Sequence, residues 1–180
     1  MNLYVMRHGT TVWNEKHISQ GRSQNRLSKN GKELVEQSAT KLKNTPFDII
    51  ISSPLMRTMQ TANIMNKYHN VKIVKDNRII EIDQGIFSGR KVSTLSEKEK
   101  MQRLDRAKEC GMEQFDEIFE RTKNFFDNLK KDYPYQNILV VTHNWIASLI
   151  EGMILNKDMD LKNIRHWANF DNAQVKHFVL

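Results

Sequence analysis

Apolar residues in this chain gather in short runs, separated by polar loops and by stretches with helical spacing. The compact runs at 3–6, 47–51 and 138–142 are mostly apolar, without alternation of polar and apolar positions, which is typical of strands buried on both faces of a parallel sheet. A shorter alternating run at 71–76 predicts another strand, and 174–180 predicts a strand at the edge of the sheet.

Between these runs the spacing of apolar side chains predicts helices. Ser28 is expected to cap a helix that closes near Lys43, and Pro54 to take the first position of a helix that reaches about Lys67. Further helical segments are expected over part of 91–108, from Met112 to Leu129, and from Trp145 to Leu155. The residues at 10–27 have no periodicity and predict a long functional loop.

The alternation of strands and helices predicts one α/β domain over residues 1–180, built as a three-layer α/β/α sandwich with a mostly parallel sheet. The 27% charged and 39% hydrophobic residues are ordinary for a globular chain. The net charge of +7 attracts anions without saying which ones. Cys110 is the single cysteine, which excludes an intramolecular disulfide and a thiolate metal cluster.

Nothing in the sequence predicts export or a membrane span. The start of the chain lacks the long apolar segment of a signal peptide. The longest apolar stretch, from Trp145 to Leu155, is interrupted by Glu151 and is far shorter than the roughly 20 residues that a span needs. We therefore expect a cytoplasmic protein without a membrane partner, whose oligomeric state the sequence does not predict.

Charged or potentially catalytic side chains follow four of the expected strands. Because the carboxyl ends of parallel strands meet at one edge of a sheet, these side chains are expected to converge on one crevice: Arg7 with His8, then Arg57, Glu81 and His143. An imidazole beside guanidinium groups suits an anionic ligand.

Six stretches match a known family in its own order: Arg7–Asn14, Gln20–Gly21, Leu27–Ser28, Ser52–Ala62, Glu81–Gly85 and Val140–His143. On these motifs the chain resembles the histidine phosphatase superfamily, in its phosphoglycerate-mutase-like branch. The family also tends to carry a Glu near the start of a long helix and an Asn close to the last strand, as Glu113 and Asn172 do here.

The resemblance implies a phosphomonoester hydrolase that acts through a phosphohistidine intermediate on a small phosphorylated metabolite. His8 would be the nucleophile, and Glu81 the proton donor. Arg7, Arg57 and His143 would hold the phosphoryl oxygens and stabilise the transition state. Two arginines neutralise a phosphate without a metal, so neither a metal nor a cofactor is expected.

Five further residues are expected to contact the substrate: Thr11, Asn14, Gln20, Gly21 and Asn144. For Asn14 and Gln20 an equally good interpretation is that each side chain bonds the backbone of its own loop. The chain also departs from the family, with Thr10 where Glu or Gln is common and Asn144 where Gly is usual. Both departures are expected to change the mouth of the site.

Two alternative functions remain open. A phosphoglycerate-type mutase would need a longer insertion than the 27 residues between Gly85 and Glu113. That short segment, at 86–112, is expected to form a small cap. A non-catalytic phosphate-binding module or nucleic-acid binder is suggested by the basic residues within 90–108, but acidic residues are interleaved and no aromatic platform accompanies them. We therefore expect a hydrolase with no nucleic-acid partner.

Overall fold

The fold is built on a five-stranded sheet, seen in a computed structural model that describes residues 1–156 and 169–180. Its order is β3-β2-β4-β1-β5. Neighbouring strands are parallel except for the β1 and β5 pair, so the prediction of a mostly parallel sheet with a final edge strand is confirmed. The strands are β1 (Asn2–Arg7), β2 (Ile49–Ser52), β3 (Lys72–Lys75), β4 (Asn137–Thr142) and β5 (Val175–Val179).

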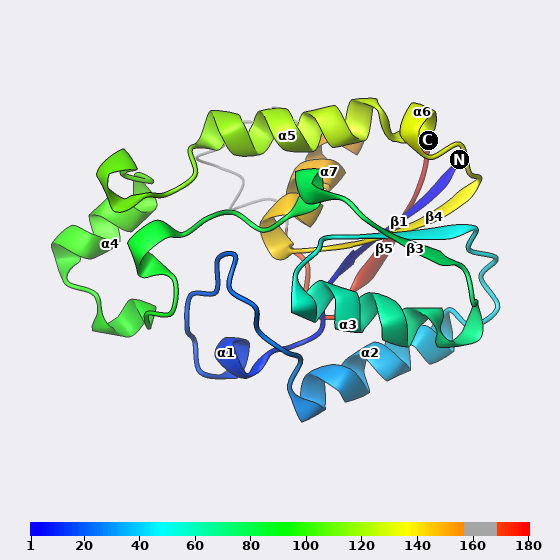
Figure 1. Cartoon of the computed structure of the whole chain (residues 1–180), viewed down its shortest axis with the longest axis horizontal. Coiled ribbons are helices and arrows are strands. Elements are labelled where there is room, and N and C mark those ends of the chain that lie inside the picture. The colour runs from blue at the N-terminus through cyan, green and yellow to red at the C-terminus, as the bar shows by residue number, and fades with distance from the viewer. Residues whose placement is uncertain (157–168) are drawn as a thin grey trace.

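Helices cover both faces of the sheet, as Figure 1 shows, which confirms the three-layer sandwich. On one face lie α2 (Lys29–Lys41) and α3 (Met56–Met65), and on the other lie α5 (Phe115–Asp127) and α7 (Asn144–Ile154). The shorter helices are α1 (Val12–Glu15), α4 (Glu97–Leu104) and α6 (Leu129–Asp132).

Each central strand supplies side chains to two cores because successive strand residues point to opposite faces. In β4, Ile138 and Val140 pack with α5 and α7, whereas Leu139 and Val141 pack with α2 and α3. The predicted Ser28 cap is confirmed, since its side chain accepts a hydrogen bond from the Gly31 N–H. A cap of this kind stabilises a helix by about 1 kcal/mol.

Three predicted boundaries are wrong. The third helix begins at Met56 instead of Pro54, because Ser53 still pairs with β4 through Val141 and Leu55 remains extended as the N-cap. The long helix expected from Met112 begins at Phe115 and ends at Asp127, with Leu129 already in α6. Helix α1 was not predicted, because it is a single turn held by a capping box rather than by apolar spacing.

The segment at 86–112 packs beyond the carboxyl end of the sheet, next to the loop that contains α1 (Figure 1). It has a small apolar core of its own: Phe87, Leu95, Cys110 and Met112. An ion pair of 2.6 Å joins Arg90 to Glu99, and the Ser19 N–H donates to the Arg90 carbonyl. In the described part of the chain, none of the helices has the length and apolar character needed to cross a bilayer.

Candidate active site

The two histidines of the site lie side by side because of the sheet register. Strand β1 pairs with β4 so that Arg7 is opposite Thr142, and the residues that follow each strand are His8 and His143. The His8 N–H donates to the Thr142 carbonyl at 3.0 Å. Both imidazoles are buried, and their ring centroids are 5.2 Å apart. The predicted convergence of these two strand ends is observed.

The ring of His8 is fixed in one tautomer. Its Nδ1 lies 2.7 Å from the Gly9 carbonyl oxygen, which only accepts hydrogen bonds, so the ring proton is on Nδ1. Nε2 therefore carries the lone pair, and the Arg57 Nε–H donates to it at 3.2 Å. Burial, followed by the charge of Arg57, holds the pKa of His8 well below its usual range. His8 is thus a neutral imidazole whose unprotonated Nε2 is the nucleophilic nitrogen.

Arg57 lies in the first turn of α3 with no exposed surface. Its two terminal nitrogens donate to the carbonyl oxygens of Gly21 and Ser23, each at 2.9 Å. Gly21 has a φ of +49°, a left-handed conformation that suits glycine and turns its carbonyl toward Arg57. Burial lowers the pKa of Arg57 to about 10, so the guanidinium stays charged at neutral pH. The long loop thus acts as a clamp for Arg57.

Arg7 is held by a segment from the far end of the chain. One terminal nitrogen of Arg7 donates to the Phe170 carbonyl at 2.6 Å, and its buried Nε has no partner within the described residues. The Phe170 N–H in turn donates to the Asn144 side chain at 2.9 Å. Asn172 donates to the His8 carbonyl at 3.1 Å. Asn144 and Asn172 therefore brace the backbone around Arg7 and His8.

Glu81 reaches the site by a route that the sequence pattern did not reveal. It follows a single helical turn at Asn77–Ile79 instead of a strand end, and Thr142 anchors that turn through the Ile79 carbonyl at 2.8 Å. One Glu81 oxygen accepts the Ile82 N–H at 3.0 Å, and the other lies 3.8 Å from Nδ1 of His143. Burial raises the pKa of Glu81, and the charge of Arg57 opposes this rise.

A charged cluster supports the backbone of Glu81, and two of its members, Arg22 and Arg121, were not predicted from the sequence. Arg22 donates to the Glu81 carbonyl at 3.1 Å and to Glu113 at 2.9 Å, and Arg121 donates to Glu113 at 2.8 Å. Although burial opposes it, the hydrogen bond from Arg121 keeps the pKa of Glu113 below its usual range. Arg22, Glu113 and Arg121, with Asp83, line a groove of about 410 Å³. The sequence signals were Glu113, which the family resemblance had indicated, and the position of Arg22 directly after the matching Gln20-Gly21 pair.

The remaining loop residues bond mainly to one another. Thr11 is the buried N-cap of α1, and its hydroxyl lies 3.0 Å from the Gln20 side-chain oxygen. Asn14 accepts hydrogen bonds from the N–H and the hydroxyl of Thr11 through Oδ1. For its Nδ2 amide the described residues supply no recorded acceptor. The Nδ2 of Asn14 and the Nε2 of Gln20 are therefore both donors that a ligand could use, since the described residues supply neither with a recorded acceptor.

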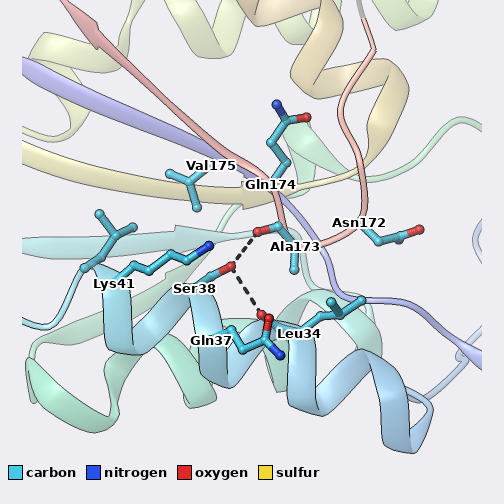
Figure 2. A pocket seen from close by; sticks show the side chains of 9 residues that line it. Leu34, Gln37, Ser38, Lys41, Asn172, Ala173, Gln174 and Val175 are labelled. Carbon is cyan, nitrogen blue, oxygen red and sulfur yellow. Dashed lines mark hydrogen bonds between the residues drawn. The ribbon is translucent and has the colours of Figure 1, made fainter.

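A second hollow, of about 380 Å³, lies between α2 and the start of β5 (Figure 2). Its wall includes Leu34, Lys41 and Gln174, and a hydrogen bond of 2.8 Å from Ser38 to the Ala173 carbonyl crosses it. Asn172 belongs to its lining and also bonds the His8 backbone. Over the ranges 1–156 and 169–180, there is no group of three His, Cys, Asp or Glu side chains suited to a metal ion.

The fold and this site define an α/β protein that gathers two histidines, two arginines and one glutamate at the carboxyl edge of its sheet. The chain belongs to the histidine phosphatase superfamily (branch 1), whose sequence profile it matches over residues 3–180.

Comparison with individual proteins agrees with this assignment. The chain is 33% identical over 180 residues to phosphoserine phosphatase 1 of Hydrogenobacter thermophilus, covering 96% of this chain and 83% of the relative. The α-ribazole phosphatase of Shigella flexneri has a similar structure, with a TM-score of 0.87, 22% identity, and coverage of 98% and 89%. A phosphoglycerate mutase from Bacillus anthracis superposes with a TM-score of 0.80, 24% identity, and coverage of 98% and 86%. The two structural likenesses bear on the fold alone.

Proposed function

We propose that this chain hydrolyses small phosphomonoesters through a phosphohistidine on Nε2 of His8. The observation that carries the proposal is the ring geometry, in which Nδ1 is fixed on the Gly9 carbonyl and the Nε2 lone pair faces Arg57. A neutral nitrogen with a depressed pKa keeps its lone pair at physiological pH.

In the first step, Nε2 of His8 attacks phosphorus in line with the ester oxygen. The P–N bond forms as the P–O bond breaks, and the departing alkoxide takes the proton of Glu81. Arg7, Arg57 and His143 donate to the three phosphoryl oxygens. The buried Nε of Arg7, which has no partner among the described residues, supports this role. The Nε–H of Arg57 must turn from His8 to a phosphoryl oxygen as the substrate enters.

In the second step, water attacks phosphorus while the Glu81 carboxylate takes its proton. The P–N bond breaks, inorganic phosphate leaves, and His8 is neutral again. The raised pKa of Glu81 supports both roles, because a carboxyl group with a pKa closer to neutrality exchanges protons more readily at physiological pH.

The surrounding residues take supporting roles in this proposal. Asn14 donates to the phosphoryl group through its Nδ2, whereas Thr11, Gln20 and Gly21 shape the loop that holds Arg57. Asn144 acts through Phe170 on Arg7 instead of touching the substrate.

We also propose how the chain is organised around the reaction. It forms one domain in which the segment at 86–112 caps the site, and its separate apolar core supports this view. Phosphoserine is the first substrate to test, because the relative with 33% identity is named for it. A cytoplasmic location fits a chain whose single cysteine is free.

The test is to trap the intermediate. Purified protein is mixed with ³²P-labelled phosphoserine or a broad panel of phosphomonoesters, quenched within milliseconds and assayed for acid-labile, alkali-stable phosphate. Wild-type protein should carry the label and release inorganic phosphate, and His8→Ala should do neither. Label that persists in His8→Ala would refute the assignment, and label that returns to a second substrate hydroxyl would make the protein a mutase.

A further inference from the structure

Ser53 is a buried residue with no role in the mechanism above, and it contacts the second histidine directly. It follows β2, which pairs with β4, so that the Ser53 N–H donates to the Val141 carbonyl at 3.0 Å. This register places its hydroxyl 2.8 Å from Nε2 of His143. Neither side chain has appreciable exposed surface. The other ring nitrogen, Nδ1, is buried, has no hydrogen-bond partner among the described residues, and lies 3.8 Å from Glu81.

The hydrogen atoms available here favour one tautomer of His143. Ser53 has one hydroxyl hydrogen, and in the described part of the chain His143 is the one recorded partner of that hydroxyl. If Nε2 carried the ring proton, the serine hydrogen would be buried without an acceptor, at a cost of about 1–3 kcal/mol. The Nδ1 lone pair would also face the Glu81 oxygen, which is unfavourable when Glu81 is ionised.

With the ring proton on Nδ1, both conflicts disappear. Ser53 donates to the Nε2 lone pair, and the Nδ1–H points toward Glu81 and the space between the two histidines. His8 and His143 then share a tautomer and present opposite nitrogens. His8 presents the bare Nε2, whereas His143 presents the Nδ1–H.

We propose that Ser53 is a positioning residue that holds His143 as its Nδ1–H tautomer, so that a neutral imidazole donates a hydrogen bond to the transferred phosphoryl group. The second half of this statement rests on the proposed function, but the tautomer does not. Ser53 acts through His143 and does not itself touch the substrate.

Nitrogen NMR of the ligand-free protein tests the tautomer without any assay of activity. In ¹⁵N-histidine-labelled wild-type protein, the signals of His143, assigned by their loss in His143→Gln, should show a protonated Nδ1 and an unprotonated Nε2. A protonated Nε2 in wild type would overturn the proposal at once, whatever the variants do. Ser53→Ala should lose the single-tautomer signature, and Ser53→Thr, which keeps a hydroxyl, should retain it.

Inorganic phosphate and substrate then test what the tautomer does. Ser53→Ala should form the phosphoenzyme more slowly by a factor on the order of 10², the scale of losing one transition-state donor, and should bind inorganic phosphate more weakly. Ser52→Ala is the matched control, because Ser52 is equally buried but bonds the Ser53 carbonyl instead of a histidine. In Ser52→Ala, the tautomer of His143 and the rate of phosphoenzyme formation should match those of the wild type. A shifted tautomer with an unchanged rate in Ser53→Ala would refute the donor role alone.

Discussion

Arg57 Nε and His8 Nε2 lie 3.2 Å apart and form a hydrogen bond in the ligand-free site. The bond covers the lone pair that we propose attacks phosphorus. It also places a guanidinium N–H where a phosphoryl oxygen can replace the imidazole as acceptor. One residue therefore both protects the nucleophile and receives the substrate, and its charge keeps the pKa of His8 low, second to the effect of burial.

Replacing Arg57 by Gln should separate these effects. Without the positive charge the pKa of His8 should rise, yet stay below its ordinary value of 6.5 because burial remains. Phosphoenzyme formation should slow by a factor on the order of 10²–10³. An NMR titration of His8 and a rapid-quench assay measure the two changes. The matched control is Arg26→Gln, at an exposed arginine of the loop that holds Arg57. An unchanged His8 pKa in Arg57→Gln would contradict the electrostatic account.

Replacing Glu81 by Gln should affect substrates according to their leaving groups. An alkyl phosphate needs a proton on its departing oxygen, whereas nitrophenolate leaves as a stable anion. Phosphoenzyme formation from a sugar or serine phosphate should fall by a factor on the order of 10²–10⁴, and the fall for nitrophenyl phosphate should be much smaller. The first step must be measured, since Glu81 also serves the second. Equal losses would point to an electrostatic role for Glu81, leaving Asp83 as the next candidate acid.

The core of the fold could be predicted because local patterns determine it. Apolar runs fixed β1, β2 and β4, and the order of the motifs placed Arg7, His8, Arg57 and His143 at one edge. The supporting contacts could not be predicted. The contact of Asn144 with Phe170 and that of Arg22 with Glu113 join residues far apart in sequence through single hydrogen bonds. The spacing of apolar residues along the sequence does not predict such a contact.

Activity should not depend on a divalent metal, because Arg7, Arg57 and His143 supply the positive charge and donors that a metal would bring. Release of phosphate from phosphoserine or the best panel substrate should be unchanged after dialysis against excess EDTA. The control is the same dialysed protein, assayed in parallel after Mg²⁺ or Zn²⁺ has been added back. Loss on chelation with recovery on metal addition would contradict the proposed site.

Stability should fall as the pH drops below about 6.5, the ordinary histidine pKa. The pKa values of His8 and His143 are both lowered in the folded state, mainly by burial. The unfolded chain therefore binds more protons in this range, so acid favours unfolding. Glu81 acts in the opposite sense, since its raised pKa makes the folded state take up protons above pH 4.5.

Urea unfolding at several pH values in the Glu81→Gln background isolates the histidine contribution. The free energy of unfolding should rise between pH 5 and pH 7 in that background. Adding His143→Gln should reduce the rise and leave the part due to His8, whereas adding the exposed substitution His177→Gln should not reduce it. The same slope with and without His143 would show that another group is responsible.

The position of β4 in the middle of the sheet bears on how the protein is made by the ribosome. β1 pairs with β4 and β5. Asn2 can therefore pair with Asn137 only after a further 135 residues have been synthesised. At about 5–20 residues per second, that interval is on the order of ten seconds. Throughout it, β1, the apolar strand that His8 follows, lacks both of the strands with which its backbone pairs. Of the five strands, β1 therefore goes longest during synthesis before either of its neighbours exists.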